Sequence, residues 1–341
     1  MSDQFLTSRV ALSAVVAVVL LAPAPVAGQT RAAAPAKAKK WTPARTPDGQ
    51  PDLQGMWTNP TITPFERPTA LAGKAFLTEQ EAAAAEQQAA ERRENAERAP
   101  APGDVGSYND FWFDSGTKVV ATRQTSLVID PPDGRVPVRP EAEAARDHNL
   151  TNVDSYESMS PWDRCITRGP GRMFPAGYNN AYQIVQTPGY VVILQEMIHE
   201  ARIIPVDGRP HLDQSIRLWT GDPRGRWEGN TLVVETTNFN DKGWITTNAA
   251  SARIRGVPHS DALRLVERFS RVDADTISYE VTIEDPKIFT RPWTVAIPLG
   301  RDDSYQMFEY ACHEGNQAIE HVLSSARTAE RLAAEEAAKK K

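Results

Sequence analysis

The stretch ALRLVERFSRVDADTISYEVTIE, residues 262–284, decides the fold. In residues 276–284 every odd position is apolar and every even position is polar, which is the period of a half-buried β-strand. Residues 262–271 alternate in a similar way, and Asp273-Ala-Asp275 between the two runs is typical of a turn. The stretch therefore predicts two consecutive antiparallel strands.

Six further strands are predicted around this pair, separated by turn residues such as Asp207-Gly208 and Glu228-Gly-Asn230. They cover residues 182–187, 190–198, 201–206, 231–238, 290–298 and 305–311. Because no helix long enough to connect parallel strands lies between them, they should form a meander. A meander of about eight strands hides its edges most economically by closing into a barrel. We therefore predict a mainly β protein with a lipocalin-like (calycin-like) barrel, and a sandwich is the second choice.

The N-terminus is typical of a secretory signal. Arg9 precedes an apolar run from Val10 to Leu21, and small residues and prolines follow as far as Ala27-Gly28. An apolar run of about a dozen residues is too short to span a bilayer and suits a signal peptide. We expect a periplasmic or secreted protein, with no membrane insertion after the signal is removed.

The rest of the chain divides by composition. The predicted parts are a signal peptide at 1–27, a flexible linker at 28–45, an irregular arm at 46–177 with one solvated helix at 78–98, the main β-barrel body at 178–316, and a charged helical tail at 317–341. The formal net charge of −6, without a basic stripe, gives no reason to expect a nucleic-acid partner. The expected partner is a small-molecule ligand or substrate, and the sequence makes no prediction of oligomeric state.

Two cysteines, Cys165 and Cys312, are present. In an oxidising compartment the default expectation is one disulfide that closes a long loop. The alternatives are two unpaired thiols or a metal pair, and neither has supporting spacing. The histidines lack the spacing of a zinc-protease helix, and no nucleophile elbow or phosphate-binding glycine loop appears. We therefore predict neither a metal nor an organic cofactor.

Two glutamates interrupt apolar rows. Glu267 shares a predicted strand face with Leu265 and Phe269, and Glu196 shares one with Val192 and Leu194. Inward carboxylates are costly unless they are paired or functional. Glu–Arg pairs that fix strand register are one interpretation. In the other, both glutamates line a barrel cavity, where burial raises a carboxylate pKa toward the range of a general acid or base.

The functional interpretation assigns roles to residues near these glutamates. Glu196 and Glu267 act as acid, base or orienting carboxylates, and His199 and His313 carry protons. Arg202 steadies an anionic group of the substrate. Tyr178, Asn180 and Glu309 add hydrogen bonds. The predicted protein is a small-molecule lyase, hydratase, isomerase or hydrolase. A non-catalytic carrier of an apolar or amphipathic ligand is the alternative, and an envelope interaction module using the arm and the tail is a third hypothesis.

Four blocks of sequence carry a resemblance. They are Pro51-Asp-Leu-Gln-Gly-Met-Trp57, Glu196-Met-Ile-His-Glu-Ala-Arg202, residues 225–239 (GRWEGNTLVVETTNF) and Glu309-Tyr-Ala-Cys-His-Glu-Gly-Asn316. Together they resemble a large group of secreted bacterial proteins over roughly residues 41–327. The resemblance implies an exported protein with a body of this kind, and it brings no activity or catalytic residues with it.

Overall fold

The computed structural model describes residues 41–96, 116–151, 155–170, 173–175, 177–245 and 256–340. The predicted signal peptide and residues 28–40 of the predicted linker lie outside the described residues. The helices are α1 (Glu79–Ala96), α2 (Pro140–Thr151) and α3 (Ala318–Lys339), with 3₁₀ turns η1 (Thr69–Leu71), η2 (Tyr156–Ser158) and η3 (Met197–His199). The strands are β1 (Gly55–Thr58), β2 (Val128–Asp130), β3 (Tyr182–Thr187), β4 (Tyr190–Gln195), β5 (Ala201–Pro205), β6 (Asp222–Glu228), β7 (Thr231–Thr237), β8 (Trp244–Ile245), β9 (Val257–Pro258), β10 (Arg264–Arg271), β11 (Thr276–Glu284) and β12 (Trp293–Arg301).

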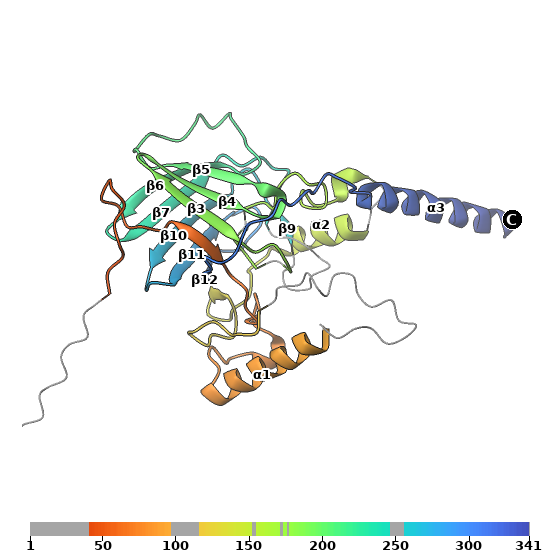
Figure 1. Cartoon of the computed structure of the whole chain (residues 1–341). Coiled ribbons are helices and arrows are strands. Elements are labelled where there is room, and N and C mark those ends of the chain that lie inside the picture. The colour runs from red at the N-terminus through yellow and green to blue at the C-terminus, as the bar shows by residue number, and fades with distance from the viewer. Residues whose placement is uncertain are drawn as a thin grey trace, which may run out of the picture. The chain divides into compact units, whose positions relative to one another are not determined.

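Nine strands form a nearly closed antiparallel barrel, which confirms the predicted fold class (Figure 1). Their order is β5-β4-β3-β1-β12-β11-β10-β7-β6, and β2 pairs with β12 beside this path. The two end strands, β5 and β6, approach each other closely. A Cβ atom placed on Gly225 of β6 would lie 3.0 Å from Cγ2 of Ile204 on β5.

One barrel strand comes from the segment predicted to be an irregular arm. β1 lies between β3 and β12, with Trp57 opposite Tyr182 on one side and Arg301 on the other. Trp57 is fully buried and joins the barrel core. A strand of four residues among prolines has too little alternation to be recognised, so its assignment depends on pairing with distant parts of the chain.

The barrel core consists of alternate residues of the strands, as predicted for residues 262–284. Ile277, Tyr279, Val281 and Ile283 of β11 are all buried, and Leu265, Glu267 and Phe269 of β10 face the same interior. The apolar members belong to one continuous cluster that draws on every strand of the barrel from β1 to β12 except β6. The barrel interior is therefore a packed core.

The predicted face of β4 is wrong. Val191, Ile193 and Gln195 are buried, whereas Tyr190, Val192 and Leu194 are only partly buried. The cause is that β4 is apolar on both faces, so alternation does not distinguish them. Its outward residue Val192 continues a row across the sheet, opposite Val185 of β3 and Ile203 of β5.

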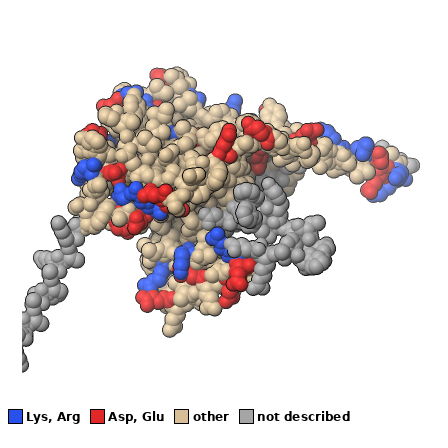
Figure 2. Space-filling view, in the orientation of Figure 1, with Lys and Arg blue, Asp and Glu red and all other residues tan. Residues whose placement is uncertain are grey.

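Other local differences lie in the connections. Residues 305–311, predicted as a strand, have no regular secondary structure, and α2 and β6 occur where none was predicted. The two predicted helices correspond to α1 and α3. Within the described ranges, none of the helices is long and apolar enough to cross a membrane. On the face drawn in Figure 2, acidic and basic side chains are intermixed.

Candidate functional site

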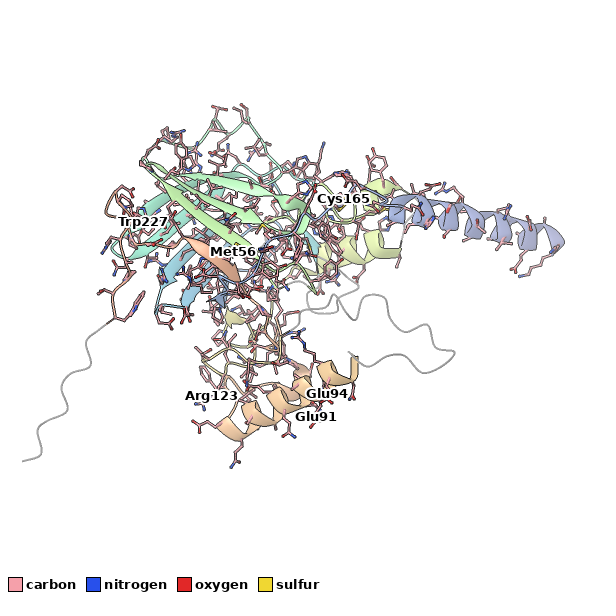
Figure 3. All side chains as sticks on the ribbon, viewed as in Figure 1. Met56, Glu91, Glu94, Arg123, Cys165 and Trp227 are labelled. Carbon is pink, nitrogen blue, oxygen red and sulfur yellow. A yellow bond between two sulfur atoms is a disulfide. The ribbon has the colours of Figure 1, made fainter. Side chains whose placement is uncertain are left out.

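The predicted disulfide between Cys165 and Cys312 is confirmed, with a Cα–Cα distance of 5.7 Å. Cys165 belongs to the irregular segment before β3 and is labelled in Figure 3, and Cys312 belongs to the segment between β12 and α3. The bond holds the second segment against the first. It thereby fixes Tyr310 near the end of β4, where residues of both segments contact the η3 turn.

We call the group Arg168, Tyr178, Glu196, His199 and Tyr310 the β4–β5 corner. Its backbone is strained. Among the described residues six non-glycine residues have a positive φ, and four of them lie at or beside this corner: Cys165 (55°), Asn179 (52°), Ile198 (63°) and His199 (42°). A β-branched residue such as Ile198 avoids this region strongly. Such strain gathers at functional sites, where the surrounding structure enforces it.

Glu196 is fully buried at this corner, although it lies directly before the η3 turn, between that turn and β4. The hydroxyl of Tyr305 donates to its two carboxylate oxygens at 2.7 and 2.9 Å, and the backbone N–H of Phe308 donates at 3.2 Å. These donors hold the carboxylate in one orientation. Glu196 therefore ties the segment after β12 to the η3 turn.

His199 is exposed, and its Nδ1 lies 2.9 Å from the backbone carbonyl of Tyr310. Because a carbonyl only accepts, this contact places the proton of a neutral imidazole on Nδ1. The other ring nitrogen, Nε2, has no partner within the described part of the chain. In the neutral ring Nε2 is then an acceptor directed away from this bond, as a general base requires.

Tyr178 and Tyr310 form the aromatic wall of the corner. Their rings stack with centroids 6.2 Å apart and planes inclined by 22°. Burial raises the pKa of the Tyr310 hydroxyl, and its hydrogen bond with Tyr178 raises that pKa further. The Tyr310 hydroxyl therefore stays protonated at neutral pH.

Arg168 has no carboxylate partner among the residues that the structure describes. Its Nη2 donates to the carbonyl of Phe174 at 3.3 Å, while its Nη1 is sealed from solvent and has no hydrogen-bond partner among the described residues. Burial lowers the pKa of this guanidinium, against a smaller opposing effect of Tyr182, Tyr178 and Tyr310. A buried guanidinium without a carboxylate partner is costly and favours an anion or a water molecule beside it.

Arg202 and Glu267 lie elsewhere, inside the barrel. Nη1 of Arg202 donates to Oε1 of Glu267 at 2.8 Å, and Nη2 contacts Oε2 and also donates to Thr236 at 2.6 Å. The hydroxyl of Tyr279 donates to Oε1 at 3.1 Å. Burial lowers the pKa of Arg202, but the charge and the hydrogen bonds of Glu267, together with smaller effects of Tyr279 and Glu200, outweigh it, and the pKa is raised overall. This geometry is that of a structural ion pair between strands.

The remaining predicted site residues, Asn180, Glu309 and His313, differ in burial. Asn180 is buried directly before β3, whereas Glu309 and His313 are exposed on the segment that the disulfide holds. The structure thus brings together Tyr178, Glu196 and His199, and it separates them from the Arg202–Glu267 pair. In the described residues, no three side chains of His, Cys, Asp or Glu gather as a metal site would need.

Sequence reasoning missed Arg168, Tyr305 and Tyr310. Arg168 lies in an irregular segment, where strand alternation gives no information on burial. The only sequence signal for the two tyrosines was their proximity to Cys312, which the disulfide prediction already placed near residue 165. Comparison of the chain with protein-family models, with curated proteins and with solved structures finds no match.

Proposed function

We propose that the protein binds a small organic anion at the β4–β5 corner and transforms it by acid–base chemistry. The observation that carries the proposal is the sealed Nη1 of Arg168, which has no acceptor in the described residues. A carboxylate or phosphate oxygen of a ligand supplies that acceptor and the missing negative charge together.

In this proposal each corner residue has one role. Arg168 holds the anionic group. One hydroxyl of the Tyr178–Tyr310 pair donates to the other, and the remaining hydroxyl of the pair donates a hydrogen bond to the anionic group. His199 takes or returns a proton at Nε2, because its Nδ1 is already bound to the carbonyl of Tyr310. Glu196 is a positioning residue that keeps the segment carrying Tyr310 in place.

The competing hypothesis of a carrier for an apolar ligand requires room inside the barrel. The packed core there gives it less support than a site at the corner. The proposal also places the protein in the periplasm or outside the cell, since a disulfide of this kind persists in oxidising compartments.

The test is to incubate the purified protein with a defined panel of small hydroxy acids, unsaturated acids and phosphate esters, and to follow each compound by mass spectrometry. We expect at least one acid to be consumed far beyond one molecule per protein. His199→Asn should reduce turnover by roughly 10²–10⁴-fold, because the amide of asparagine cannot accept and return a proton near neutral pH. Binding should be retained, because asparagine tolerates the positive φ of this position. Arg168→Gln should abolish binding.

The matched control is Arg209→Gln, which removes an exposed arginine that pairs with Asp207 away from the corner. It should leave turnover unchanged. Binding at one molecule per protein without any product would favour the carrier. If Nη1 instead bonds a structural water, no compound of the panel will bind or be consumed, and the proposal fails. Thermal unfolding of each variant separates loss of binding from loss of folding.

A further inference from the structure

A surface hollow of about 400 Å³ lies outside the β4–β5 corner. Three segments line it: the connection between β5 and β6, the turn after β7, and the start of the approach to β10. The lining residues are Arg217, Trp219, Asn240, Asp241, Lys242 and Asp261. The volume is within the range of small-molecule sites, and none of these residues belongs to the β4–β5 corner.

The connection that carries Arg217 and Trp219 is held in place by one buried residue. The side-chain amide of Asn238, which is 3% exposed, donates to the carbonyls of Leu212, Asp213 and Ile216 at 3.2, 3.0 and 3.1 Å. Asn238 itself adopts a positive φ of 59°. This clamp fixes a connection that otherwise runs along the surface (Figure 1).

Backbone hydrogen bonds extend the clamp to the opposite wall. The N–H of Leu218 donates to the carbonyl of Asn238, and the N–H of Asn240 donates back to Leu218, both at 2.9 Å. The N–H of His259 donates to Gly243 at 3.0 Å, and a Cβ atom at Gly243 would lie 2.0 Å from Nε2 of His259. The turn at 240–243 therefore packs directly on a buried histidine, and hydrogen bonds hold the two facing segments of the hollow in place.

The chemistry of the lining is mixed. Trp219 offers a partly exposed indole ring, and around it stand two cations and two carboxylates, so the hollow has no net formal charge. Asp241 and Lys242 make no hydrogen bond or ion pair through their side chains in the described residues. Arg217 donates to the carbonyl of Asp261 at 3.1 Å, and Asp261 pairs with Lys287.

We propose that this hollow binds a carbohydrate ring. A pyranose has an apolar C–H face that packs on an indole and a rim of hydroxyls that both donate and accept hydrogen bonds. Trp219 packs against the C–H face of the ring, and Asn240, Asp241 and Lys242 form hydrogen bonds with adjacent hydroxyls. The carboxylates of Asp241 and Asp261 would repel a simple anion, and Lys242 and Arg217 would repel a simple cation. The hollow therefore suits a neutral ligand better than an ion.

The test is calorimetric titration of the purified protein with maltotriose, cellotriose and triacetylchitotriose, with glycylglycine as a zwitterionic probe. We expect one saccharide to bind with one molecule per protein. Trp219→Ala should weaken it about tenfold or more, because a central aromatic contact carries much of the affinity of a small site. Trp41→Ala removes an exposed tryptophan outside the hollow and should leave the affinity unchanged.

Lys242→Gln is a second variant. Because Lys242 is exposed, the substitution should change ligand binding without affecting the stability of the fold. It should weaken the same saccharide without changing the unfolding temperature. The proposal is overturned if no saccharide binds at millimolar concentration, if only glycylglycine binds, or if Trp219→Ala and Lys242→Gln bind the saccharide as tightly as the unaltered chain.

Discussion

His259 is a single residue whose burial has a consequence measurable in solution. It is 2% exposed, its Nδ1 lies 3.1 Å from the carbonyl of Ser260, and its Nε2 has no partner in the described residues. Burial lowers its pKa, and the hydrogen bond to Ser260 and the charges of Asp285 and Asp241 only partly oppose this. The folded protein therefore keeps this imidazole neutral to a lower pH than the unfolded chain does.

The sign of the resulting pH dependence follows from linkage. Below about pH 6.5 the unfolded chain protonates this histidine more fully than the folded chain does, so stability falls as the pH falls, by up to about 1.4 kcal/mol per pH unit. Urea unfolding between pH 7.5 and 5.5 should therefore show a steeper loss of stability for the unaltered chain than for His259→Gln. Equal slopes in the two proteins would mean that this histidine takes up its proton over the same pH range in the folded and the unfolded chain.

At the same scale, burial of single residues was predictable only where a regular strand carried them. Glu267 was correctly expected to face inward, because Leu265 and Phe269 on either side set an unambiguous alternation. Glu196 is buried as expected, but its burial comes from the η3 turn and from the donors Tyr305 and Phe308. The burial of Arg168 was not predictable from the sequence, because an irregular segment has no periodic pattern of buried and exposed residues.

At the scale of elements, strands with one polar face were predicted well and the others were not. β11 alternates strictly and β10 alternates apart from Val266 and Glu267, so their positions and faces follow from the sequence. β4 is apolar on both faces and its orientation was wrong. β1 and β6 were missed because proline, glycine and charged residues hide their strand character, and only pairing with β3, β12 and β7 establishes them.

The Arg202–Glu267 pair acts at this scale, because it ties end strand β5 to β10 and, through Thr236, to β7. Glu267→Gln leaves the buried guanidinium without its counter-charge and should reduce the free energy of unfolding by about 3–5 kcal/mol. The paired change Arg202→Met with Glu267→Leu removes both charges and should cost clearly less. Urea unfolding at pH 7 compares the three proteins. An equal loss in the single and paired variants would show that hydrogen bonds to Thr236 and Tyr279 matter more than charge.

At the scale of the whole molecule, the disulfide is the covalent link that encloses the barrel. Cys165 precedes β3 and Cys312 follows β12, so the closed loop of 147 residues contains every barrel strand except β1. A loop of this length restricts the unfolded chain strongly, and removing the link should cost about 4–5 kcal/mol in the entropic account. The same link also holds Tyr310 beside Tyr178.

Replacing both cysteines with serine should therefore have two effects of different size. Stability to urea should fall by about 4–5 kcal/mol, and residues 302–317 should become sensitive to protease before the barrel unfolds, because few of their side chains are buried. Limited proteolysis followed by mass spectrometry locates the first cuts. If the first cuts instead fall within the barrel strands, the disulfide holds the barrel itself closed, and the segment after β12 owes its position to Tyr305 and Glu196.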